Sequence, residues 1–205
     1  KEIITACEHS QVVCVLVTKE TKTEQPPRLF DLTTLQRAAN RIYGYTAKQT
    51  LDYAQALYEK KLITYPRTDS RCLTEDMIVS TVNNILGKND FDTERIKVVF
   101  DSKKVTDHHA IIPTVSSLSE DLSGIPESEA KVYRLISNKL HASVGYPLVE
   151  NTTKIVAEFD GFQFTSTGKV IKDEGFTKYL KEYKSKKNED MALPDVSISD
   201  VLSIE

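Results

Sequence analysis

The stretch from Leu62 to Arg71 reads LITYPRTDSR and contains a tyrosine two residues before an arginine. A tyrosine hydroxyl is largely protonated at neutral pH, so it acts as a nucleophile only where its surroundings activate it. Arg67 can offer a bidentate fork to the oxygens of a phosphodiester that Tyr65 attacks. The pair therefore predicts attack on a phosphate. Taken alone, such a loop more often has a structural interpretation, in which Tyr65 packs at a helix end among solvated charges.

Other polar residues of this loop fit the same chemistry. Arg71 adds positive potential, and Thr68 and Ser70 can hydrogen-bond phosphate oxygens or fold the loop back on itself. Asp69 would repel a phosphate, so we expect it to orient Arg67 or Arg71. The loop would then combine one nucleophile with several groups that hold an anion.

A second group of candidate residues lies in DHHAIIPT, at residues 107–114. Adjacent side chains point in different directions, and no further ligands converge on His108 and His109 in the sequence, so we expect no metal site. A histidine can instead donate to a scissile phosphate or to a departing oxygen. The alternative is that one histidine is buried and hydrogen-bonded while the other is solvated.

The composition sets broad limits on fold and partners. With 205 residues, of which 40% are hydrophobic, the chain can bury a sizeable core in one or two domains. Its net charge of −3 gives no global signature of nucleic-acid binding. Between Arg28 and Arg71, however, eight Lys or Arg residues outnumber four Asp or Glu residues. This local surplus suits a phosphate-bearing partner, and it is also compatible with an ordinary solvated basic face.

The three cysteines, Cys7, Cys14 and Cys72, show no repeated close spacing. Their odd number argues against a disulfide framework and a zinc site, and it fits a reducing cytoplasm. The sequence has no apolar run long enough to span a membrane and no signal peptide. Because it starts and stops within apparent strands, we expect it to be part of a larger protein.

The spacing of hydrophobic residues along the sequence indicates which elements would position the tyrosine loop. Residues 11–18, QVVCVLVT, predict a strand, and the polar stretch after it predicts a linker. Thr33 with Gln36, and Thr46 with Gln49, have the spacing of capping boxes and predict two short helices that resemble a helix-turn-helix unit. The buried face of the second helix is expected to contain Leu51, Ala54, Leu57 and Tyr58.

After the histidines the pattern indicates one more long helix and then strands. Residues 126–144 predict a helix with a buried stripe at helical spacing, formed by Val132, Leu135, Ile136 and Leu140. The segment TTKIVAEFDGFQFTSTGKVI predicts a hairpin that turns at Asp160 and Gly161. The order of strand, helical block and strands predicts a multi-domain α and β fold in which a mainly helical domain is inserted into a β-rich one.

Four segments together resemble a known family. PPRLFDLTTLQRAAN, AKQTLDYAQALYEKKLITYPRTDSR and DHHAIIPT, in this order and spacing, look like type IA DNA topoisomerases, most closely the topoisomerase III branch. YPLVENTTKIVAEFDGFQFTSTGKVI looks like the return of that family into its β domain. The resemblance covers nearly the whole chain and identifies it as a central fragment that carries the catalytic tyrosine. One departure is Phe176, where tryptophan is the more usual aromatic.

The resemblance implies roles for particular residues. Tyr65 would be the nucleophile that forms a 5′-phosphotyrosyl bond with one DNA strand. Arg67 would hold the scissile phosphate, and His108 would contact the DNA. Thr68 and Arg71 of the same motif are expected to bind DNA as well. The second histidine of the pair lies at a variable position and is left without a role.

The resemblance also implies an architecture. A helical domain at 28–145, with a helix-turn-helix-like core, would carry the tyrosine. A β-rich hinge or arch domain would be contributed in part by residues 1–27 and 146–205. The Mg²⁺ of the full-length enzyme would be bound by a domain outside this chain, so we expect the fragment itself to bind no cofactor.

The implied function is cleavage and religation of one DNA strand by transesterification, which allows strand passage without ATP. We expect DNA, preferentially single-stranded, as the partner, no membrane association, and no relaxation activity in the fragment alone. The main alternative is a non-catalytic helix-turn-helix DNA-binding module in which Tyr65 is merely packed. A tyrosine recombinase or phosphodiesterase is a further alternative, but the several separated arginines of a recombinase have no match. A reachable Tyr65 hydroxyl beside Arg67 and His108 would favour the enzyme.

Overall fold

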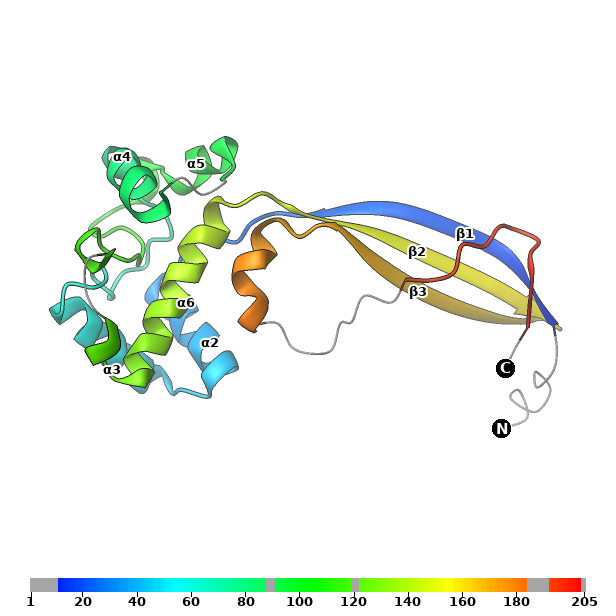
Figure 1. Cartoon of the computed structure of the whole chain (residues 1–205), viewed down its shortest axis with the longest axis horizontal. Helices are drawn as coiled ribbons and strands as arrows, with labels where there is room; N and C mark the ends of the chain where they lie inside the picture. The colour runs from blue at the N-terminus through cyan, green and yellow to red at the C-terminus, as the bar shows by residue number, and fades with distance from the viewer. Residues whose placement is uncertain (1–10, 88–90, 119–121, 184–191, 204–205) are drawn as a thin grey trace. The chain divides into compact units, whose positions relative to one another are not determined.

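The computed structural model of the chain describes residues 11–87, 91–118, 122–183 and 192–203. These residues form two units. We call the unit with all four strands the β unit. The other, the helical unit, comprises Gln25–Pro147 together with a later segment that begins at Gly175. The fold is therefore mixed α and β, and the β unit is built from segments that precede and follow the main helical segment in the sequence (Figure 1).

The β unit is an antiparallel sheet in the order β3-β2-β1-β4. Its strands are β1 (Gln11–Glu24), β2 (Leu148–Phe159), β3 (Phe162–Asp173) and β4 (Val201–Ser203). The strand expected at 11–18 is longer than predicted, because β1 stays paired with β2 as far as Glu24 opposite Leu148. The polar residues 19–24 therefore belong to the sheet, and the expectation of a linker there is wrong.

The predicted hairpin joins β2 to β3. Phe159 pairs with Phe162, so Asp160 and Gly161 form a two-residue turn. Their φ angles are 47° and 79°. Positive φ at both central residues is the requirement of a type I′ turn, which Asp-Gly satisfies well. The predicted turn position is confirmed.

The helical unit begins with α2 (Leu32–Tyr43) and α3 (Ala47–Glu59). The predicted capping box of Thr46 and Gln49 is confirmed at the start of α3. For α2 the predicted cap is wrong, because the side chain of Asp31, and not that of Thr33, accepts a hydrogen bond of 2.6 Å from the Thr34 backbone N–H.

Shorter helical segments follow the tyrosine loop. They are η1 (Glu75–Met77), α4 (Ile78–Ser80), η2 (Thr81–Leu86), α5 (Thr93–Val99), η3 (Ser102–Lys104), η4 (Ser116–Leu118) and η5 (Leu122–Gly124). The histidine segment crosses the helical unit in extended form and makes isolated bridges, Phe30 to Ile111 and Ile63 to Pro113. These bridges join the chain before α2, the start of the tyrosine loop and the histidine segment into one layer.

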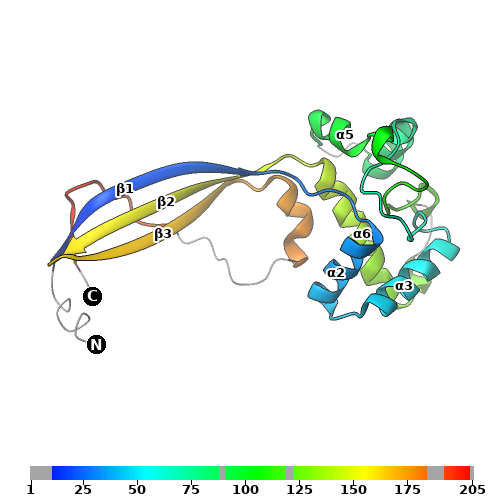
Figure 2. The same ribbon diagram turned by 180° about the vertical axis from the view of Figure 1, so that it is seen from behind.

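The long helix α6 (Glu127–Val144) supplies the centre of the helical core. Its predicted stripe is confirmed, because Val132, Leu135, Ile136 and Leu140 are all buried. Val132, Leu135 and Ile136 pack with buried residues of α2 and α3, whereas Leu140 packs in a second cluster with Leu29 and Leu73. Figure 2 shows α2, α3 and α6 gathered on one side of the helical unit.

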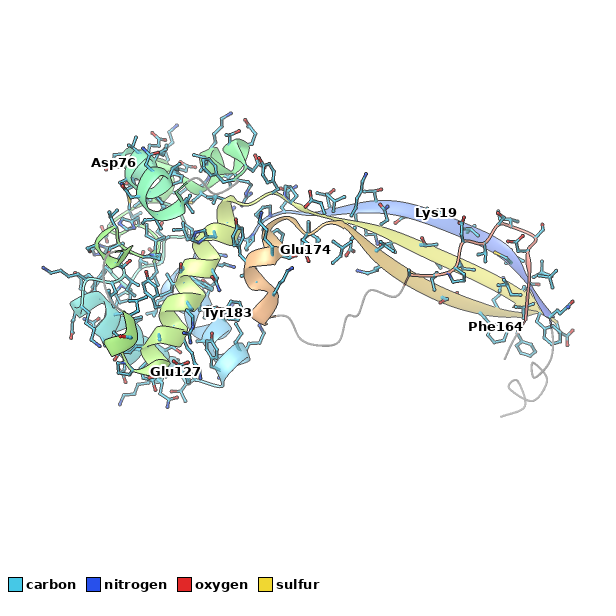
Figure 3. All side chains as sticks on the ribbon, in the orientation of Figure 1. Lys19, Asp76, Glu127, Phe164, Glu174 and Tyr183 are labelled. Atoms are coloured by element: carbon cyan, nitrogen blue, oxygen red, sulfur yellow. The ribbon has the colours of Figure 1, made fainter. Side chains whose placement is uncertain are left out.

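The last element of the helical unit is η6 (Gly175–Tyr183), which packs on α6. Asn138 donates a hydrogen bond of 3.0 Å to the Tyr183 hydroxyl, and Figure 3 shows Tyr183 beside this helix. Gly175 has φ 49°, and a Cβ there would collide with the Pro147 carbonyl, so only glycine fits. The main segment of this unit is Gln25–Pro147, compared with expected limits of 28 and 145, and the unit also contains η6, which the prediction placed in the β-rich domain.

Candidate active site

The tyrosine loop presents alternate residues to solvent. Tyr65 is partly exposed and Arg67 and Asp69 are exposed, whereas Pro66, Thr68 and Ser70 are buried. In an extended chain, residues two apart share one side. The loop therefore displays the phenol and the guanidinium on its solvent side and uses the residues between them as anchors.

Hydroxyl groups hold the loop in place. The Thr64 hydroxyl donates to the Ala110 carbonyl at 3.1 Å and accepts from the Ile112 backbone N–H at 3.0 Å. The Thr68 hydroxyl donates to the His108 carbonyl at 3.0 Å and accepts from the Ser70 backbone N–H at 3.1 Å. These bonds fix the tyrosine loop and the histidine segment against each other.

Three rings meet at the phenol. The ring centroids of Tyr65 and His108 are 4.5 Å apart, and their planes are tilted by 50°. Tyr58, at the end of α3, lies edge-on to Tyr65 with a centroid distance of 5.3 Å. Tyr58 and His108 are both exposed. The structure thus brings Tyr65 and His108 together and leaves the rings accessible to a ligand.

The two arginines of the motif differ in their surroundings. Within the described part of the chain, no hydrogen bond or ion pair engages the Arg67 guanidinium, so its donors are free for a ligand. Arg71 is partly buried, and its Nε donates to the Leu29 carbonyl at 3.0 Å. One edge of Arg71 is therefore committed to the fold, and the rest of its fork remains for an anion.

The remaining predicted residues have simpler surroundings. Thr68 is 8% exposed, and its hydroxyl is already engaged by two partners, so it supports the loop from within. Asp69 is exposed. The partly buried His109 directs Nδ1 to within 2.8 Å of the Ala110 carbonyl oxygen.

Two residues were missed in the sequence. Tyr58 was expected in the buried face of α3, but it is 39% exposed and flanks Tyr65. Lys139 occupies a position of the α6 stripe, at helical spacing from Val132 and Ile136, where an apolar residue is expected. A lysine inside an apolar stripe is a signal that the sequence alone contained.

No group of three or more His, Cys, Asp or Glu side chains is arranged for a metal ion in the residues that the structure describes. These residues therefore do not fit the Mg²⁺ that the resemblance implies. Cys14 and Cys72 are buried free thiols, whereas Cys7 lies outside the described residues. Among the described helices, none combines the length and apolar composition that crossing a bilayer requires.

Comparison with known proteins identifies the family of the chain. A family model described as DNA topoisomerase matches residues 1–205, so the chain belongs to this DNA topoisomerase family. Its relatives include the DNA topoisomerase 3 of Bacillus licheniformis, 34% identical over 97% of this chain, and that of Shouchella clausii, 37% identical over 82%. These relatives confirm the expected resemblance to the topoisomerase III branch of the type IA enzymes.

The chain spans only 29% of the length of the Bacillus licheniformis relative and 25% of the Shouchella clausii relative. Among solved structures, the full-length topoisomerase I from Thermotoga maritima matches with a TM-score of 0.73 and 20% identity. That match covers 98% of this chain and 34% of the other. It supports the same fold across both units.

Proposed function

We propose that this chain is the tyrosine-bearing part of an enzyme that cleaves and rejoins one strand of DNA through a covalent phosphotyrosine. The contact between Tyr65 and His108, on the side of the loop that exposes Arg67, is the observation that carries the proposal. The Tyr65 phenol, a ring nitrogen of His108 and the unengaged Arg67 guanidinium could then contact one phosphodiester together.

In the proposed step, the Tyr65 hydroxyl oxygen attacks the phosphorus and the bond from phosphorus to the 3′ oxygen breaks. The phenolic proton passes to solvent water, and the departing 3′ oxygen gains a proton, for which His108 is the proposed donor. Arg67 stabilises the charge on the non-bridging oxygens. Attack of the 3′ hydroxyl on the phosphotyrosine reverses the step, so the phosphodiester bond is conserved and no ATP is consumed.

The proposal assigns the units different tasks. The helical unit, with its α2–α3 pair, carries the tyrosine, and the β unit belongs to a hinge or arch that lets the tyrosine move while another strand passes. Single-stranded DNA is the preferred partner, with Arg67, Arg71 and His108 at the interface and the buried Thr68 supporting the loop behind them. The magnesium ligands belong to residues outside this chain, and the protein acts in the cytoplasm. The 205-residue chain alone is expected to be inactive in relaxation.

The test uses a full-length protein that contains this chain and a single-stranded oligonucleotide labelled at one end or the other. A 5′-phosphotyrosyl bond leaves the downstream fragment on the protein. A 3′ label should therefore migrate with denatured protein, and a 5′ label should appear on a shorter free strand. A protein that binds the oligonucleotide but retains neither label would instead support the non-catalytic DNA-binding module.

A further inference from the structure

A lysine in the core-facing stripe of α6 lacks an acidic partner. Lys139 is partly buried, and its Nζ lies 4.9 Å from the centre of the Phe30 ring. Among the described residues, no carboxylate lies within ion-pair distance of it, whereas Lys60 of the same unit pairs with Glu129 at 2.5 Å. Lys60 thus has a counterion in the fold, whereas the described residues provide none for Lys139.

The groups around Lys139 are themselves cationic. Arg71 is bound through Nε to the carbonyl of Leu29, the residue next to Phe30. Arg41 lies in the exposed last turn of α2, a helix that contacts α6. Burial, together with the positive charges of Arg71 and Arg41, lowers the pKa of Lys139 to about 8. Both arginines therefore act on the charge of Lys139.

Such a cluster is unfavourable without an anion. A partly desolvated ammonium beside like charges raises the free energy of the folded state, and the Phe30 ring compensates only part of this cost. Perturbed cations with no partner in the fold mark candidate binding sites. An anion of the right geometry would relieve the repulsion and engage the free edge of the Arg71 fork.

We propose that Lys139 and Arg71 bind one backbone phosphate of the DNA strand at a site separate from the scissile phosphate. The proposal rests on the DNA chemistry proposed above. Arg71 follows Tyr65 by six residues, which span at most about 20 Å. The second phosphate would therefore lie within a few nucleotides of the one attacked, and the site would fix the register of the strand.

The test measures binding of a fluorescent dT12 oligonucleotide to the 205-residue chain by anisotropy across a range of salt concentrations. Lys139→Met keeps an apolar side chain over Phe30 but removes the charge. The matched control is Lys131→Met, which removes a lysine of the same helix whose Nζ lies 5.8 Å from the Tyr43 ring. Circular dichroism melting verifies that each variant is folded.

Loss of one phosphate contact should weaken binding about 10-fold and reduce the slope of log K against log salt by about 0.7 in Lys139→Met. Lys131→Met should leave the slope unchanged. In the double variant Lys139→Met/Arg71→Met the slope of log K against log salt should fall by about 0.7 in total, because both side chains hold the same phosphate.

A Lys139→Met variant with the wild-type slope, or the same loss of slope in Lys131→Met, would overturn the second phosphate site and leave the proposed strand cleavage untouched. A double variant whose slope falls by about 1.4 would overturn the shared phosphate. A folded wild-type chain that binds no oligonucleotide at all would overturn this site and also remove the DNA-binding support for the proposed function.

Discussion

The tyrosine loop and the β2–β3 turn are both short connecting segments, but they are held in different ways. At the turn, the strand pairing of Phe159 with Phe162 and the positive φ of Gly161 are sufficient. In the loop, side-chain hydroxyls of Thr64 and Thr68 bind backbone groups of the distant histidine segment. The turn is held locally, whereas the loop depends on a segment far along the sequence.

This difference shows how the loop can be rigid and yet expose reactive groups. A hairpin is held by hydrogen bonds of its backbone, and its turn side chains are not needed to hold it. The loop engages the hydroxyls on its buried side, so Tyr65 and Arg67 remain on the solvent side. Placement by side chains that are not themselves reactive is the kind of support that a precise site requires.

The sharpest contrast between the tyrosine loop and the sheet is expected at Arg67. Arg67→Ala in the full-length protein should slow strand cleavage about 100- to 1000-fold, because a donor to the transition-state charge is lost. Lys154→Ala on β2 removes an exposed cation from the sheet and should leave the rate within about twofold. Single-turnover cleavage of a labelled strand measures both. Equal effects of the two variants would show that Arg67 acts only through general charge.

The helical core should be more sensitive to truncation than the sheet surface. Ile136→Ala removes a fully buried side chain and should reduce the free energy of unfolding by about 3 kcal/mol. Val170→Ala removes a side chain that is 47% exposed and should cost about 1 kcal/mol or less. Urea denaturation of the 205-residue chain followed by circular dichroism measures the two values. A larger loss in Val170→Ala would mean that the sheet surface is covered by another part of the protein.

Much of the fold could be predicted because its signals are local. The α6 stripe, the capping box at Thr46 and the Asp160-Gly161 turn each depend on residues a few positions apart. The true length of β1 could not be predicted, because residues 19–24 are polar and join the sheet only through pairing with β2. The cap of α2 was misassigned because Asp31 and Thr33 are both good capping residues two positions apart.

The candidate site could be predicted only in part, for the same reason. Motifs that resemble a family pointed to Tyr65, Arg67 and His108. The hydrophobic periodicity of the sequence could not show that Tyr65 and His108 lie together in the fold. Tyr58 follows the helical period of α3 but lies at its end, where the chain turns and exposes it. The Thr68 hydroxyl was expected at the phosphate, but its partner is a carbonyl that only folding brings near.

The clamp between the loop and the histidine segment can be tested directly. Thr68→Val keeps the shape but leaves the Ser70 N–H and the His108 carbonyl without this partner, so the free energy of unfolding should fall by about 2 kcal/mol. The matched Thr167→Val on the exposed surface of β3 should change it by about 0.5 kcal/mol or less. Calorimetric melting compares the two. If they behave alike, hydroxyl bonds do not hold the loop.

The smallest effect is expected at the hairpin turn. A Cβ on Gly161 would meet no atom within 4 Å, but its φ of 79° is unfavourable for other residues. Gly161→Ala should therefore lower the free energy of unfolding by about 1 kcal/mol and leave DNA cleavage unchanged. Denaturation and cleavage assays on the same preparation check both halves. A loss of cleavage would indicate that the turn is part of the site.

The central claim is that Tyr65 forms the covalent bond to DNA, and trapping by a phenylalanine variant tests it most directly. Tyr65→Phe keeps the ring beside His108 and removes the attacking oxygen, at a cost of about 1 kcal/mol or less in stability. Tyr53→Phe, at a partly buried tyrosine that lies in α3, is the matched control. We predict that Tyr65→Phe binds the 3′-labelled strand but forms no denaturation-resistant adduct, whereas Tyr53→Phe traps it like the wild type. An adduct in Tyr65→Phe would contradict the account.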